Sequence, residues 1–250
     1  MTPSTRTPNS RLGTRDDATP TAAAERSRAA DHAPDPAVVG WLVMAFAGLG
    51  IFAATTILLL NGWMPGFDQP LLDIAKQWQG LAPLWRVISE SANIPLIVIG
   101  VGMVLVLFFT HHRREAVLVA VILIAITAGS EAVKQLVHRD RPSGTDPNIP
   151  GVVYSYPSGH VLEALTIFGI LAIRAFRSHL ATIVRVLIVI AVVIDADLVG
   201  VARVALAAHW PSDTIASFFG AVGVLGIYGL MTHHRAGSDD GRPSGARAGG

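Results

Sequence analysis

The chain has 250 residues, a formal net charge of +1 and a mean hydropathy of +0.50, and only 15% of its residues are charged. This composition is too apolar for an ordinary soluble domain and indicates a membrane protein, while the small net charge excludes a global field for nucleic acid. Because the chain has no cysteine, disulfides, thiolate metal sites and cysteine nucleophiles are excluded as well.

The two ends of the chain differ in composition from its middle. Residues 1–36 and 233–250 are rich in Ala, Gly, Pro, Ser and Arg and nearly lack large apolar side chains, so we expect disordered tails. Residues 37–232 then form the membrane domain. The apolar segment that begins near Val38 follows a polar stretch without an early cleavage pattern, and we expect a retained first span and not a signal peptide.

Apolar stretches long enough to cross a bilayer can be placed at six positions, since a spanning helix needs about 20 predominantly apolar residues. The sequence therefore predicts an all-α, polytopic membrane protein with six transmembrane helices. The predicted spans are residues 38–60, 95–110, 116–137, 160–176, 180–201 and 211–231, of which the second and fourth are short.

The connection between the first two spans, residues 61–94, is long and amphipathic. Its apolar side chains at helical spacing are Leu71, Ala75, Trp78, Ala82 and Trp85. The pattern predicts one or two interfacial helices, interrupted around Gly80 and Pro83. A small helical cap outside the membrane is an equally good interpretation.

Lysine and arginine counts predict the orientation. The tails and two of the loops place twelve of these residues on one side of the membrane, and the other side holds six. Both termini are therefore expected in the cytoplasm.

Three polar clusters occur at helix ends on the extracytoplasmic side. They are KQLVHRDRP at residues 134–142, YPSGH at 156–160 and ARVALAAHWPSD at 202–213. Taken singly, each has an ordinary structural explanation, such as a snorkelling cation, an interfacial histidine or a first-turn proline. Taken together, three cations, two histidines and a carboxylate converging from three apolar segments indicate an anion site.

Phosphate fits this arrangement. Lys134, Arg141 and Arg203 would form a positive pocket in which arginine can bind two phosphate oxygens. Ser158 and Gly159 stand where a helix begins, so backbone N–H groups and a hydroxyl would point at the same anion.

Two histidines beside such a pocket suit phosphoryl transfer. His209 would be the nucleophile, with Asp213 four residues later fixing its tautomer, and His160 would be the general acid for the leaving oxygen. No metal or other cofactor is required, because the cations already neutralise phosphoryl charge.

The three clusters resemble the motifs of the type 2 phosphatidic acid phosphatase (PAP2) superfamily, K-x6-R-P, P-S-G-H and S-R-x5-H-x3-D, in order and internal spacing. The resemblance covers about residues 116–231, and the predicted layout is similar to the membrane lipid phosphatase branch. It implies a phosphohistidine on His209, with the same roles for the other residues. Ala202 stands where the family usually has serine, which implies a weaker or shifted site.

Other polar residues of the spans are expected to support the structure. Glu131 and Glu163 could contact Lys134 and His160 one turn away, although an interhelical hydrogen bond is the better expectation for either. Asp195 and Asp197 are expected to pair with Arg203 or Lys134. Arg185 is predicted to be a snorkelling or interhelical residue.

The expected function is hydrolysis of a membrane lipid phosphate at the extracytoplasmic surface. A polyprenyl diphosphate of the undecaprenyl type is the first choice of substrate, with phosphatidic acid and phosphatidylglycerol phosphate as alternatives. A phosphatase for soluble esters and a lipid phosphotransferase are competing enzymes. A transporter or a non-catalytic lipid-binding protein is the competitor from another class.

Overall fold

The structure, a computed structural model, describes residues 35–145 and 154–236. The tails predicted to be disordered lie almost entirely outside these ranges. Within them the chain is helical, and the only strand-like pairing is an isolated bridge between Asp140 and Tyr154. The helices are α2 (Pro36–Leu60), α3 (Asp68–Lys76), α4 (Ala82–Ser91), α5 (Ile94–Phe109), α6 (Arg113–Val137), α7 (Gly159–Phe176), α8 (Thr182–Ala205) and α9 (Pro211–Ala236).

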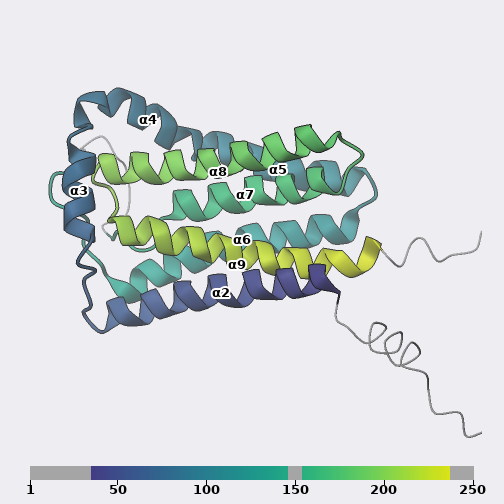
Figure 1. The fold of residues 1–250 in the computed structure, drawn as a ribbon, viewed down its shortest axis with the longest axis horizontal. Helices are drawn as coiled ribbons and strands as arrows, with labels where there is room; N and C mark the ends of the chain where they lie inside the picture. The colour runs from purple at the N-terminus through teal and green to yellow at the C-terminus, as the bar shows by residue number, and fades with distance from the viewer. Residues whose placement is uncertain (1–34, 146–153, 237–250) are drawn as a thin grey trace, which may run out of the picture. The chain divides into compact units, whose positions relative to one another are not determined.

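Six long helices run back and forth beside one another, and α3 lies across one end of this bundle (Figure 1). The start of α2 and the end of α9 lie at the opposite end. Each predicted span coincides with one long helix, so the all-helical membrane fold is confirmed. Within the described residues, five segments are long and apolar enough to cross a membrane: Pro36–Leu60, Gln79–Phe109, Arg113–Val137, Gly159–Phe176 and Pro211–His233.

Helix α7 occupies the centre of the bundle and packs against α5, α6, α8 and α9. Its apolar side chains are buried on several faces, including Val161, Ala164, Ile167 and Ile170. The outer helices instead expose large apolar side chains, which suits a lipid surrounding. The polar start of α7 is therefore enclosed by other helices.

The amphipathic connection forms two helices, α3 and α4, joined by a 3-10 turn at Gln79–Leu81. This confirms the predicted interruption near Gly80. The buried face of α3 is formed by Leu72 and Ala75, whereas Leu71, which the spacing assigned to that face, is exposed. Leu72 and Ala75 pack with residues at the end of α8, so α3 covers the turn between α8 and α9.

Glycines allow α2 and α9 to approach each other closely. A Cβ atom at Gly226 would overlap the backbone of Ala45, and one at Gly223 would overlap Leu49. Small residues at such positions are typical of helix pairs in membranes, where close packing replaces the hydrophobic effect as the driving force.

Replacing Gly226 with alanine should therefore loosen the α2–α9 pair. We expect Gly226→Ala to lower the free energy of unfolding by about 1–3 kcal/mol, as overpacking does in other tightly packed interiors. Gly50→Ala on α2 is the matched control, because in the described part of the chain no atom beyond the adjacent backbone of α2 lies within 4 Å of a Cβ there. Thermal unfolding in detergent measures both, and equal midpoints would contradict the close contact.

Candidate active site

The turn between α8 and α9 determines how close His209 lies to Arg203, which precedes it by six residues. Ala207 has a left-handed backbone conformation with φ of 51°. Its N–H donates to the carbonyl oxygen of Val204 at 2.9 Å, and the N–H of Ala208 donates to that of Arg203, also at 2.9 Å. This is a Schellman motif, which ends a helix and reverses the chain. It brings His209 back beside the side chain of Arg203.

His209 is only 3% exposed, and its two partners define its tautomer. Its Nδ1 atom lies 2.5 Å from the carbonyl oxygen of Ser155, which can only accept a hydrogen bond. Its Nε2 atom lies 3.4 Å from Nη2 of Arg203, which can only donate. Nδ1 therefore carries the proton, and Nε2 presents a lone pair to the pocket.

The surroundings also keep this imidazole neutral. Burial lowers the pKa of His209 to about 4; nearby Asp213 opposes the shift, and the positive charges of Arg203 and Arg141 add to it. A neutral imidazole with a free Nε2 lone pair is the form that can act as a nucleophile.

Asp213 does not hold His209 in the way its spacing predicts. Its Oδ2 atom is 3.8 Å from Nδ1 of His209, beyond hydrogen-bonding distance, and accepts instead from the backbone N–H of Trp210 at 2.9 Å. Its Oδ1 atom accepts from Arg139. The prediction of a direct His209–Asp213 hydrogen bond is therefore wrong, because the helix start and the buried Arg139 compete for the same carboxylate.

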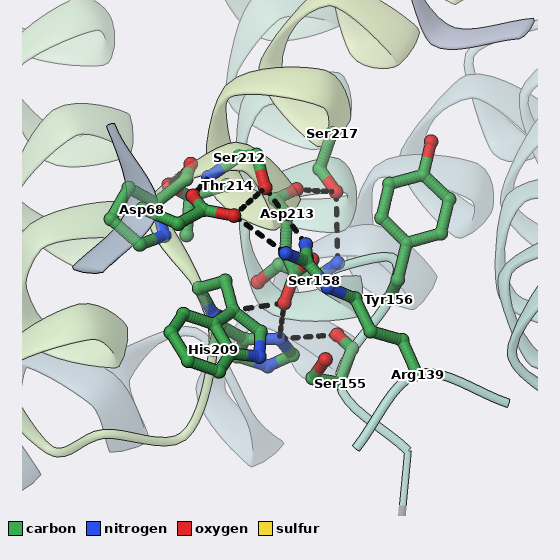
Figure 2. A network of polar contacts seen from close by, with 12 residues as sticks. Asp68, Arg139, Ser155, Tyr156, Ser158, His209, Ser212, Asp213, Thr214 and Ser217 are labelled. Atoms are coloured by element: carbon green, nitrogen blue, oxygen red, sulfur yellow. Dashed lines mark hydrogen bonds and ion pairs between the residues drawn. The ribbon is translucent and has the colours of Figure 1, made fainter. Parts of the chain in front are cut away.

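Arg139 belongs to the site, although its position in the sequence indicated only a charge that helps to orient the chain in the membrane. It is 7% exposed and donates to Asp213, to Ser212 Oγ at 2.8 Å and to Asp68 Oδ2 at 2.5 Å (Figure 2). Asp68 is at the start of α3 and also accepts from the backbone N–H of Ser212. The only sequence signal for Asp68 was its place as an acidic residue at the start of an amphipathic helix. Acidic residues are common at helix starts for structural reasons, so this signal does not indicate function.

The carbonyl group that orients His209 is itself fixed by the segment before α7. The N–H of Ser155 donates to the carbonyl oxygen of Arg139 at 2.7 Å, and its hydroxyl donates to that of Asp140 at 3.1 Å. The next residue, Tyr156, is fully buried and hydrogen-bonds Thr56 of α2 at 2.8 Å. Burial raises the pKa of Tyr156 to about 12, so this phenol stays protonated.

The start of α7 is arranged differently from the predicted cradle of two backbone donors. The N–H of Ser158 donates to Ser217 Oγ of α9 at 2.9 Å, so this donor is already used (Figure 2). The hydroxyl of Ser158, in contrast, is buried and has no partner within the described residues. A Cβ atom at Gly159 would lie 3.9 Å from Nζ of Lys134, which places that ammonium group against the start of the helix.

The cations that face this helix start retain unused donors. Arg203 is 4% exposed and donates to Ser89 Oγ of α4 at 2.9 Å. The buried Nε atoms of Arg203 and Arg141 have no hydrogen-bond partner within the described residues. Burial lowers the pKa of Arg141, although arginine remains charged in proteins. In the part of the chain that the structure describes, Nε of Arg139 and of the distant Arg185 is unpartnered as well, so the missing bond alone is not specific. What distinguishes Arg141 and Arg203 is that their free donors lie in the same group of residues as the unpartnered hydroxyl of Ser158.

His160 lies among the same groups. Arg203, His209, Lys134 and Arg141 all act on it electrostatically, and its side chain is partly exposed. The structure therefore brings together every predicted site residue: Lys134, Arg141, Ser158, Gly159, His160, Arg203, His209 and Asp213.

The neighbouring acids of α6 and α7 behave as helix-packing residues. Glu131 accepts from Lys134 at 3.4 Å and from Gln135 at 3.1 Å, both within α6, so the interhelical hydrogen bond that was the better expectation for Glu131 is wrong within the described residues. Glu163 accepts from Thr127 at 2.9 Å, which is the expected interhelical hydrogen bond and not a contact with His160.

The remaining polar residues of α8 lie away from this group. Asp195 and Asp197 make no hydrogen bond or ion pair inside the described ranges, so the predicted pairing with Arg203 or Lys134 is wrong. Arg185 donates to the carbonyl oxygen of Phe176 at 3.0 Å and to Thr182, at the other end of α8. Ala202, which replaces the usual serine, is fully buried.

The fold and this group of side chains define a helical membrane protein with a cationic, histidine-containing cluster of side chains at one end of its bundle. The sequence profile of the PAP2 superfamily matches residues 115–236, which contain every predicted site residue. The chain therefore belongs to the PAP2 superfamily.

A solved structure of similar fold is the transmembrane PAP2-type phosphatidylglycerolphosphate phosphatase from Bacillus subtilis. The two chains are 19% identical and superpose with a TM-score of 0.56, over 80% of this chain and 100% of that chain. At this identity the likeness shows the fold alone. No curated protein matches this chain by sequence.

The lowered pKa of His209 predicts how stability depends on pH. Between pH 6.5, the ordinary value for histidine, and pH 4, the unfolded chain binds a proton at this position and the folded chain does not. Folding should therefore lose stability as the pH falls, by roughly 3 kcal/mol at pH 4 from this residue. The thermal unfolding midpoints of the wild type and of His209→Gln should therefore converge as the pH is lowered from 6.5 to 4. A difference between the two midpoints that does not vary with pH would contradict the lowered pKa of His209.

Proposed function

We propose that this protein is a membrane phosphatase that hydrolyses a lipid phosphate or diphosphate through a phosphohistidine on His209. The observation that carries the proposal is the combination of an Nε2 lone pair with unpartnered buried donors on Ser158, Arg141 and Arg203. Such a pocket is completed by an anion that offers several oxygen acceptors beside an electrophilic centre. A phosphoryl group has this chemistry.

The reaction follows from these positions. Lys134, Arg141, Arg203 and the hydroxyl of Ser158 bind the phosphoryl oxygens and neutralise their charge. Nε2 of His209 forms a bond to phosphorus while the bond from phosphorus to the lipid oxygen breaks, and His160 donates a proton to that oxygen.

Water completes the cycle. His160, now neutral, accepts a proton from a water molecule whose oxygen attacks phosphorus, the bond between phosphorus and Nε2 breaks, and inorganic phosphate leaves. No step requires a metal, because the positive charge comes from the three side chains, and we expect activity to survive chelating agents.

A groove beside the pocket supports a lipid as the substrate. It has a volume of about 640 Å³ and is lined mainly by apolar side chains of α3, α8 and α9. Val161 and Val204 line it and directly follow His160 and Arg203 in the chain. A phosphate bound by the pocket would thus have its hydrocarbon chain at the mouth of this groove, whereas a soluble ester would leave the groove unused.

Among lipids, our first choice remains a polyprenyl diphosphate of the undecaprenyl type. Phosphatidylglycerol phosphate, named for the similar solved structure, and phosphatidic acid are the alternatives. All three place a phosphate head at the membrane surface with apolar chains below it.

We further propose that α8 is a sixth span. It is 24 residues long but carries Arg185, Asp195, Asp197 and Arg203, which keep it outside the apolar segments described above. Its large apolar side chains are exposed along one stripe at helical spacing, including Ile183, Leu187, Ile190, Ile194 and Leu198. Six crossings would put both termini on the cytoplasmic side and the pocket on the extracytoplasmic side.

Single cysteines test this topology, because the chain has none of its own. Ser143→Cys lies in the exposed part of the loop after α6, and Ser178→Cys lies in the turn between α7 and α8. In intact cells we expect a membrane-impermeant maleimide to label Cys at 143 and to label Cys at 178 only after permeabilisation. Labelling of both positions from the same side would disprove the crossing of α7. Ser238→Cys, which follows α9 in the sequence, tests α8: it should be labelled only after permeabilisation if α8 also crosses, and labelling of Cys at 238 in intact cells would disprove the sixth span.

Phosphate release from a substrate panel tests the function. The purified protein should release inorganic phosphate from at least one of the three lipids, in the presence of a chelator, and much more slowly from soluble p-nitrophenyl phosphate. His209→Ala should lose at least about 10³-fold in kcat, as removal of a nucleophile does in other hydrolases. His179→Ala is the control, because His179 is an exposed residue in the turn after α7.

Full activity of the His209→Ala variant would exclude the phosphohistidine. Binding of lipid phosphate without any release of phosphate would instead favour a transporter or a lipid-binding protein.

A further inference from the structure

We propose that Asp68, at the start of α3, is a positioning residue for the reaction at His209, and this inference rests on the function proposed above. Asp68 lies outside the region that the PAP2 profile matches. It acts through Arg139 and Asp213, and it makes the interfacial helix a part of the active site.

Asp68 is 2% exposed, and both of its carboxylate oxygens are engaged. Oδ2 accepts from Arg139 Nη2 at 2.5 Å and from Ser212 Oγ at 2.7 Å, while Oδ1 accepts from the backbone N–H of Ser212 at 2.8 Å (Figure 2). Asp68 therefore satisfies a free N–H group at the start of α9 and fixes the guanidinium group that holds Asp213.

The charges of this cluster indicate a role beyond packing. Asp213 and Arg139 alone would form a neutral pair, which would stabilise a positive charge on His209 only weakly. With Asp68 the buried cluster carries a net charge of −1, and Asp213 Oδ2 lies 3.8 Å from Nδ1 of His209.

His209 acquires such a positive charge during the proposed reaction. When Nε2 bonds to phosphorus, Nδ1 keeps its proton, so the ring becomes a cation in a buried site. A negative cluster nearby stabilises that cation, because electrostatic interactions are stronger away from water.

The same helix also supports the chain that carries His209. Leu72 and Ala75 of α3 pack against Val204, Ala205 and Ala207, which belong to the end of α8 and to the turn before His209. A displacement of α3 would thus disturb both the apolar contact and the charge cluster.

A test must separate the charge of the buried cluster from the apolar packing of α3. The protonation of His209 can do so, because it responds to the charge of the cluster. The charged and titratable groups that face His209 are Asp213 of α9, Arg203 of α8, Arg141 of the loop after α6 and His160 of α7. The substitution at Asp68 replaces none of these four side chains, so a shift in the protonation of His209 would report the charge and position of the cluster that Asp68 forms with Arg139 and Asp213.

The test compares Asp68→Asn with Asp73→Asn in the full chain. Asp73 lies on the exposed side of α3 and, among the residues that the structure describes, accepts only from Gln69, at 2.8 Å, so its loss removes the same charge from the same helix. A double variant, Asp68→Asn with Arg139→Gln, returns the buried cluster to a net charge of −1. The measurement is kcat and KM for lipid phosphate hydrolysis as a function of pH, with thermal unfolding to check that each variant is folded.

Asp68→Asn should lower kcat roughly tenfold and move the acid limb of the kcat profile about one unit to lower pH, since one pKa unit corresponds to a factor of ten. KM should stay unchanged, because the phosphate-binding cations are intact. The double variant should return the acid limb toward its wild-type position, and Asp73→Asn should match the wild type throughout.

The outcomes separate this inference from the proposed function. A folded, active wild type with the same acid limb in Asp68→Asn and Asp73→Asn would overturn the role of Asp68 alone. That role would also be overturned if Asp68→Asn changed KM and stability but left the acid limb in place, or if the double variant did not restore it. A wild type that releases no phosphate would overturn the proposed function and this inference with it.

Discussion

The guanidinium group of Arg139 is buried between two carboxylates, Asp68 of α3 and Asp213 of α9. Removing one partner of such a buried pair typically costs about 3–5 kcal/mol, because it leaves a charge without compensation. The three residues come from three separate segments of the chain, so this one interaction fixes helix α3, the loop after α6 and the start of α9 relative to one another. The pocket at the end of the bundle depends on that arrangement.

The arginines near the pocket fall into two kinds. Nε is buried without a partner in all three, but Arg139 has both terminal nitrogens bound to carboxylates, whereas Arg141 and Arg203 form no ion pair with a carboxylate in the described residues. The distinction matters because a cation that is already neutralised contributes little to an incoming phosphate. The region that would bind substrate is therefore kept positive, while the region beside Nδ1 of His209 is kept negative.

Hydropathy in the sequence predicted the six long helices, and motif spacing selected eight residues that the structure brings together; their roles remain a prediction. They could do so because apolar length identifies a helix in a membrane, and because Lys134, Ser158 and His209 stand at helix ends that lie at the same end of a bundle whose helices run back and forth. The count of six crossings remains a prediction. Helix α8 carries four charged residues, and its assignment depends on the exposed apolar stripe that only the structure shows.

The support of the site could not be predicted in the same way. Asp68 and Ser212 are 144 residues apart in the chain, and no spacing rule joins them. The group that orients His209 is a backbone carbonyl, that of Ser155, which side-chain patterns do not reveal. The i,i+4 spacing suggested Asp213 instead, but the same carboxylate also satisfies the start of α9 and Arg139, and these contacts hold it 3.8 Å away.

The proposed chemistry depends on one event, the formation of a bond between Nε2 of His209 and phosphorus during turnover. It is tested most directly by mixing the protein with a lipid substrate labelled with ³²P in its terminal phosphate, quenching with alkali, which preserves phosphohistidine, and locating the label by peptide mass spectrometry. We expect label on the peptide that contains His209, in the wild type and in His179→Ala, and none in His209→Ala. Label on His160, or turnover of the lipid with no labelled histidine under conditions that preserve phosphohistidine, would contradict the proposed nucleophile.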